Sequence, residues 1–161
     1  MALIIEDGSI VAGANSYATV AEIQNYADLR NMSLPCSTGE IEVIAILAMD
    51  YLEAQCYQGE LVEPNVQPLQ WPRQYVYING EEFPNNAIPS QLKNAQIELA
   101  IAQQSISILS DGTNPADNVK REKTDMIETE YYDGGKNSVF SSQRVKSYLR
   151  YLVAPTRLVR V

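Results

Sequence analysis

The chain has 161 residues, a formal net charge of −8, no histidine and two cysteines, which suits a single domain with its own hydrophobic core. Histidine is the commonest general base and zinc ligand, and two cysteines cannot complete a zinc site. We therefore predict no enzymatic activity, no metal and no cofactor. The opening residues lack the basic segment of a signal peptide, and no apolar run approaches the about twenty residues of a membrane span, so no membrane association is predicted.

Charge is divided unevenly along the chain. Residues 1–118 contain three basic and 15 acidic side chains, a net of −12, whereas residues 119–161 contain nine basic and five acidic ones, a net of +4. Such a division can arise by chance among solvated residues, or it can mean that the two ends face different partners. The acidic majority does not favour nucleic-acid binding over the whole surface, because phosphate contacts need clustered Lys and Arg.

The N-terminal residues 1–15 are predicted to be extended, as a local edge strand or as an arm onto a neighbour. Glu6 and Asp7 precede Gly8 in a predicted turn, where both carboxylates are expected to be solvated. A first helix is predicted over residues 19–30, because Thr19 and Glu22 have the spacing of a capping box.

A second helix is predicted over residues 38–57. Ser37 and Glu40 have the capping-box spacing, and Gly59 follows as a C-terminal stop. The predicted helix is apolar around most of its circumference, which is typical of a central core helix. Cys56, near its end, is interpreted as a small buried hydrophobe rather than a reactive thiol.

A short hairpin is predicted next, because Asn79-Gly80 separates two segments rich in strand formers. Four tyrosines fall on predicted strands: Tyr75, Tyr77, Tyr131 and Tyr132. Such tyrosines suit half-buried sheets and protein interfaces, and they can also stack on single-stranded nucleic acid. Few basic residues accompany the hairpin tyrosines, which favours the first interpretation.

The remaining elements complete a mainly α fold of the α+β class. Helices are predicted over residues 89–109 and 141–153, and residues 119–132 read as one long exposed strand or two short ones meeting near Asp125. We predict one domain: a compact bundle of about four helices with β insertions over residues 16–153, an N-terminal arm over 1–15 and a C-terminal arm over 154–161. The residues of the C-terminal arm that alternate basic and apolar character are Arg157, Leu158, Val159, Arg160 and Val161.

The triplet Trp71-Pro72-Arg73 is the most distinctive local sequence. Pro72 restricts Trp71 to extended backbone geometry. The indole can fill the small helical core, with Arg73 covering it, or the triplet can anchor a subunit interface, where Trp and Arg are favoured residue types.

Several segments, in their order and spacing, resemble one family of tailed-phage proteins. They are MALIIEDG at 1–8, NSYATVAE at 15–22, AMDYL at 48–52, LQWPR at 69–73, Ile88-Pro89 before a helix with ELA at 98–100, IETEY at 127–131 and LRYL at 149–152. Over nearly the whole chain the sequence is similar to the head–tail adaptor, or connector, proteins. Members of that family are often labelled DnaT-like single-stranded-DNA-binding proteins.

The resemblance implies a structural protein of the virion neck, made in the host cytoplasm. It implies a ring, typically of twelve subunits, that binds the portal protein on one side and tail or nozzle proteins on the other. DNA would pass through the lumen without specific binding, which acidic walls would favour. The arm at Arg157–Val161 would dock on the portal. The alternatives are a DnaT-like single-stranded-DNA binder and a host-directed or regulatory binding module.

Overall fold

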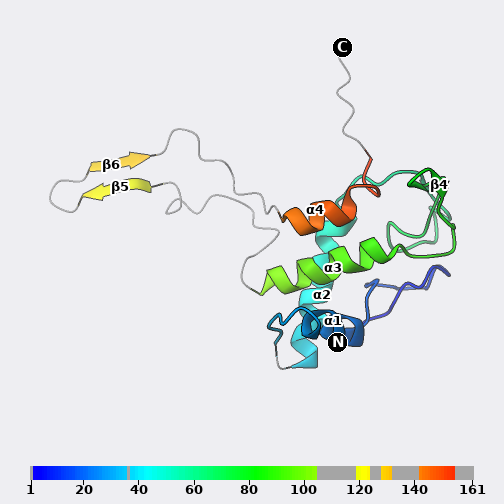
Figure 1. Ribbon diagram of the computed structural model, residues 1–161, viewed down its shortest axis with the longest axis horizontal. Helices are drawn as coiled ribbons and strands as arrows, with labels where there is room; N and C mark the ends of the chain where they lie inside the picture. The colour runs from blue at the N-terminus through cyan, green and yellow to red at the C-terminus, as the bar shows by residue number, and fades with distance from the viewer. Residues whose placement is uncertain (1, 36, 105–118, 124–127, 132–141, 155–161) are drawn as a thin grey trace, which may run out of the picture.

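The computed structural model describes residues 2–35, 37–104, 119–123, 128–131 and 142–154, and these form a mainly helical α+β structure, as predicted (Figure 1). The helices are α1 (Val20–Asp28), α2 (Thr38–Glu53), α3 (Ser90–Gln103) and α4 (Gln143–Leu149). The strands are β1 (Glu60–Leu61), β2 (Arg73–Gln74), β3 (Tyr77–Ile78), β4 (Glu81–Glu82), β5 (Val119–Lys123) and β6 (Glu128–Tyr131).

The helices pack in a simple arrangement. Helices α1, α3 and α4 lie one above another in Figure 1, and α2 runs across them. Helix α3 packs against both α2 and α4, and α1 contacts α2. The largest core cluster joins α2, α3 and α4 around Trp71, and a second cluster lies between α1 and the first half of α2, where Ile23 and Ile41 are buried. The central position of α2 confirms its interpretation as the core helix.

Helix α1 begins as the sequence predicts. The Thr19 hydroxyl accepts from the Glu22 N–H at 3.1 Å, and the Glu22 carboxylate accepts from the Thr19 N–H at 2.7 Å. Each group satisfies a helix-terminal donor that would otherwise lack a partner. Burial opposes ionisation of Glu22, but the bonds from Thr19 and from Lys93 outweigh it and lower the pKa of Glu22.

Helix α2 departs from the prediction at both ends. Ser37 is the N-cap residue, but its side chain makes no capping hydrogen bond, so the predicted capping box is wrong. The helix ends at Glu53, before the predicted limit of 57, and the chain turns at Gly59, where φ is +69°. Cys56 therefore lies outside the helix and is exposed, contrary to its expected burial.

The predicted hairpin is confirmed. Tyr77 pairs with Glu82, and Ile78 pairs with Glu81. Asn79 and Gly80 have φ values of 55° and 87°, as a two-residue turn with positive φ at both positions requires. In the segment 119–132, β5 pairs with β6 in an antiparallel ladder, so the alternative of two short strands holds.

The N-terminal segment makes local contacts, the first of its two predicted alternatives. Ile5 forms a bridge with Ser16, and the Glu6 N–H donates to the Ser16 carbonyl at 2.9 Å. Glu6 is fully buried, which corrects its predicted solvation. Its carboxylate accepts from the N–H groups of Gly8, Ile10 and Val11 at 2.8–3.0 Å, because the loop curls around it.

Candidate functional site

Trp71 lies in the core of the chain. Its side chain is fully buried, with Tyr57 and Phe83 in edge-to-face contact at ring-centroid distances of 5.9 and 6.1 Å. The backbone N–H of Trp71 donates to the Tyr17 hydroxyl at 3.2 Å. Of the two interpretations of the triplet, the structure places Trp71 in the core, and a role of this side chain at a subunit interface stays a prediction.

Arg73 ties loops together next to Trp71. Its guanidinium donates to the carbonyl oxygens of Gln58 at 2.7 Å and Gly59 at 2.8 Å, and to the carbonyl and side-chain oxygens of Gln70 at 3.2 and 2.9 Å. The residue is only 8% exposed, and burial lowers the pKa of Arg73. The arginine thus acts as a structural tie that fixes β1 beside β2. Pro72 joins Trp71 through a cis peptide bond.

The predicted docking residues of the C-terminal arm, Arg157, Leu158, Val159, Arg160 and Val161, lie outside the described residues. The described start of that arm stays on the body. The Ala154 N–H donates to the Cys56 carbonyl at 2.8 Å, and Tyr57 pairs with Val153. The arm is therefore attached to the body beside Tyr57, and its docking role stays a prediction.

A pocket with charged side chains in its lining lies between α1, α3 and α4, and the sequence patterns did not predict it. Its volume is about 540 Å³, and its lining includes Arg30, Glu98, Arg144 and Tyr148. Glu98 is buried and accepts from the Tyr26 hydroxyl at 2.7 Å and from Arg144 at 3.3 Å. A charged residue among the apolar residues of the third predicted helix was the available signal.

Two tyrosines and an arginine form a network beside Glu98, and of these tyrosines Tyr148 lines the pocket. The hydroxyls of Tyr26 and Tyr148 share a hydrogen bond at 3.0 Å, and the Arg30 guanidinium lies 3.5 Å from the centre of the Tyr26 ring. Burial, with the bonds to Tyr148 and Glu98, raises the pKa of Tyr26 above its usual value. Two guanidinium groups and one carboxylate leave the pocket with a net positive charge, which suits an anionic group.

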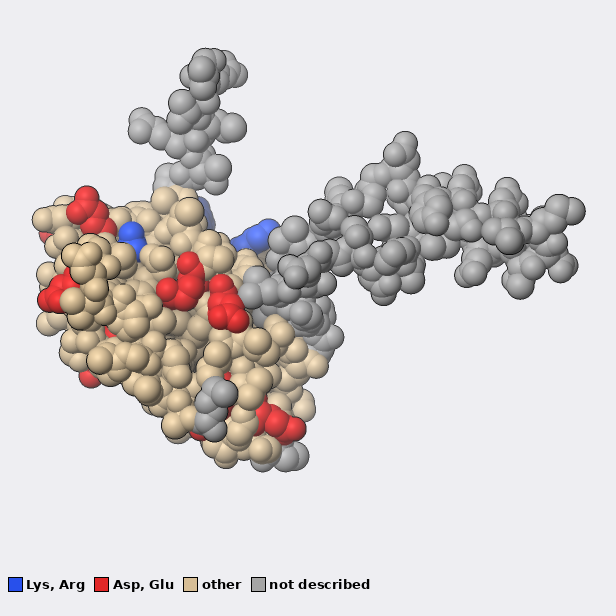
Figure 2. Space-filling model, turned by 180° about the vertical axis from the view of Figure 1, so that it is seen from behind, with Lys and Arg blue, Asp and Glu red and all other residues tan. Residues whose placement is uncertain are grey.

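The exposed charges of the described body are mostly acidic, and Figure 2 shows carboxylates scattered over one face with few cations among them. Among the residues whose side chains the structure describes, the exposed cationic ones are Arg30, Arg144, Lys146 and Arg150. Three of these four lie on α4 or at its C-cap. Positive charge is thus concentrated beside the pocket, and this location agrees with the basic character of residues 119–161.

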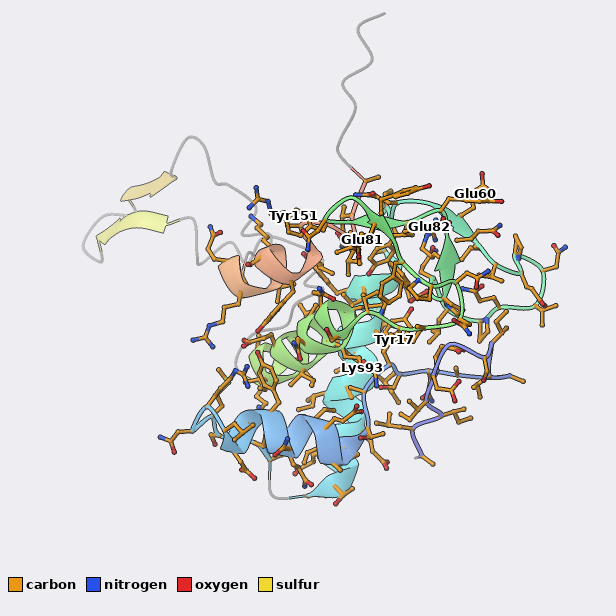
Figure 3. All side chains as sticks on the ribbon, turned by 45° about the vertical axis from the view of Figure 1, so that its right-hand side comes forward. Tyr17, Glu60, Glu81, Glu82, Lys93 and Tyr151 are labelled. Atoms are coloured by element: carbon orange, nitrogen blue, oxygen red, sulfur yellow. The ribbon has the colours of Figure 1, made fainter. Side chains whose placement is uncertain are left out.

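The hairpin carries the opposite chemistry. Glu81 and Glu82 are exposed, and Figure 3 labels both on the hairpin. Tyr75 and Tyr77 are 59% and 54% exposed on either side of buried Val76. The hairpin is therefore an acidic, aromatic surface, and this agrees with the expected scarcity of basic residues around its tyrosines. Of the other two tyrosines, Tyr132 lies outside the described residues.

Metal-binding groups and membrane-spanning helices are two further features to consider in the described residues. Within the described ranges, no group of three or more Cys, Asp or Glu side chains is placed to hold a metal ion. None of the described helices is both long enough and apolar enough to cross a membrane.

Comparison with known proteins gives one match. The model of a family described as "Putative DnaT-like ssDNA binding protein" matches residues 1–161. Searches of the curated proteins and of the solved structures gave no match. Because the family model covers the whole chain, this protein belongs to the DnaT-like family of that description.

Proposed function

We propose that the protein is a structural assembly component, without catalytic activity, that acts as a head–tail adaptor beneath the portal of a tailed phage. The observation that carries this proposal is the acidic character of the body: residues 1–118 have a net charge of −12. A protein that lines a DNA passage must let DNA slide, and acidic walls repel phosphate groups. Its proposed partners are further copies of itself, the portal protein and tail proteins.

The build of the body also supports an assembly role. The distinctive residues Trp71 and Arg73 are buried and hold loops in place, so they preserve the shape of a body that others can contact. The exposed groups that other proteins can contact include the acidic hairpin and the cationic side chains around α4. Surfaces of opposite charge are typical of protein–protein recognition, because they set orientation and partner choice.

Single-stranded-DNA binding is the second candidate, and the family description favours it over the adaptor role. The chain's own support for it is the basic segment 119–161, with a net charge of +4, together with exposed Arg144, Lys146 and Arg150. Positive charge and neighbouring aromatic rings are the usual means of binding single strands without sequence preference. Arg150 lies 5.3 Å from the ring centre of Tyr151, which is half-exposed.

A deletion separates the two candidates. Removing residues 156–161 should abolish attachment to the portal protein of the same genome, measured by co-migration on gel filtration, while circular dichroism shows that the helices remain. The intact chain should bind a fluorescent single-stranded oligonucleotide only weakly at physiological salt. Tight binding that falls steeply with salt and is lost on the same deletion would establish the DNA-binding role instead.

A further inference from the structure

We propose that two surfaces of this protein recognise each other in neighbouring copies: the acidic β3–β4 hairpin of one copy enters the Arg30–Arg144 pocket of the next. The inference deepens the proposed assembly role by naming the contact through which copies associate. Because the two surfaces differ, the contact is head-to-tail, and repetition produces a closed ring or a filament.

The pocket has the chemistry of a receptor for carboxylates. Arg144 is 63% exposed and donates to Glu98 at 3.3 Å, and Arg30 donates to the Tyr26 carbonyl at 3.3 Å. A guanidinium carries five N–H donors, so both arginines can accept a further anion. The single carboxylate in the pocket already accepts two hydrogen bonds, so one positive charge remains to be balanced.

The hairpin has the matching charge and shape. Glu81 and Glu82 are exposed, and among the described residues neither forms an ion pair. Apart from its two chain neighbours, Gly80 has no heavy atom within 4 Å of the place where a side chain would begin, so the turn is open at that position. A narrow two-residue turn that carries carboxylates is the kind of projection that a pocket of about 540 Å³ can receive.

The two surfaces lie apart on the same molecule. In Figure 1, β4 is at one side of the body, whereas the end of α3 and the start of α4 lie toward the other. A hairpin therefore does not reach the pocket of its own chain, and the complementary surface must come from a second copy. Because the surfaces are separate, a copy that has bound one neighbour through one surface still has its other surface free for the next copy, as a growing assembly requires.

Disulfide trapping tests the contact even where it is transient. In a chain with Cys36→Ser and Cys56→Ser, Asn79→Cys marks the turn and Ser147→Cys marks the pocket, so every charge is kept. The control replaces the turn cysteine by Asp50→Cys, at an exposed position on α2. On mild oxidation the first variant should give a ladder of dimers, trimers and higher species, and the control should give none.

Charge reversal tests the chemistry of the contact. Adding Arg144→Glu should lower the cross-linked fraction about tenfold or more, since it opposes like charges, and further addition of Glu81→Lys and Glu82→Lys should restore it. A ladder equal to that of the control, or one unchanged by reversal, would overturn the inference. So would suppression by a single-stranded oligonucleotide whose binding Arg144→Glu abolishes, because DNA phosphate would then be the occupant.

Portal binding by the unmodified chain separates this inference from the proposed function. If the unmodified chain co-migrates with the portal but its cysteine variant forms no ladder, the hairpin contact is refuted and the adaptor role stands. A chain that forms the charge-dependent ladder without co-migrating would refute the adaptor role and support the contact.

Discussion

Replacing Gln96 by leucine should destabilise the protein by about 3 kcal/mol. Gln96 is fully buried on α3, and its carboxamide oxygen accepts from the N–H groups of Tyr17 and Ala18, both at 3.0 Å. Its amide nitrogen donates to the Ser16 hydroxyl at 2.8 Å and the Ala45 carbonyl at 3.2 Å. One side chain thus joins the N-terminal segment to α2 and α3.

The magnitude follows from the bonds lost. Leucine fills a similar volume, so little cavity forms, but the buried Tyr17 N–H loses the Gln96 oxygen as its acceptor, which costs roughly 1–3 kcal/mol. The Ala18 N–H keeps the Ser16 hydroxyl at 3.2 Å, so its loss is smaller. The two remaining bonds add about 0.5 kcal/mol each, so the total is about 3 kcal/mol. For a protein of this size the total corresponds to a fall in Tm of about 6–12 °C.

Urea unfolding measures this prediction conveniently, because the chain has one tryptophan and it is buried in the core. Gln104→Leu is the matched control, since Gln104 makes an exposed bond to the Ser33 carbonyl, and its cost should stay within about 0.5 kcal/mol. A loss below about 1 kcal/mol for Gln96→Leu, or equal losses for the two variants, would show that Gln96 does not hold these segments together.

Three further predictions concern other buried polar groups. Glu6→Gln should lower the free energy of unfolding by about 2 kcal/mol in urea titrations, because one carboxylate oxygen that accepts from buried N–H groups becomes an NH₂ donor. Arg73→Lys should cost about 2 kcal/mol in the same assay, because an ammonium cannot reproduce the four hydrogen bonds of the guanidinium, and a cost near zero would contradict the structural role of Arg73. Burial raises the pKa of both Tyr17 and Tyr57 above the unfolded value near about 10, so their stabilising contribution is complete below that pH and is lost as pH rises through the folded pKa values. The urea midpoint should therefore fall between about pH 9 and 11, and absorbance at 295 nm should show some tyrosines ionising only on unfolding.

Local patterns predicted much of the fold because their causes are local. Thr19 and Glu22 lie three residues apart, so their capping box can be read from the sequence, and Asn79-Gly80 specifies its turn through backbone preference alone. Ser37 shows the limit of such patterns. It has the same spacing to Glu40, but its side chain makes no capping bond in the structure.

The candidate site depended on contacts that no local pattern contains. Glu98 and Arg144 are 46 residues apart, and Tyr26 lies 72 residues before Glu98, so the pocket exists only once α1, α3 and α4 have packed. The sequence predicts that Glu6 is exposed, because acidic residues before glycine usually mark an exposed turn. Here the turn closes around the carboxylate, since the N–H groups of the loop need an acceptor.

The most direct test of the assembly role is electron microscopy of the purified chain mixed with the portal protein of the same genome. We expect a ring of the protein attached to one face of the portal, with its copies in contact and its central channel open. Portal particles without the ring, under conditions in which the same chain binds a single-stranded oligonucleotide tightly at physiological salt, would rule out the adaptor role and establish DNA binding as the function.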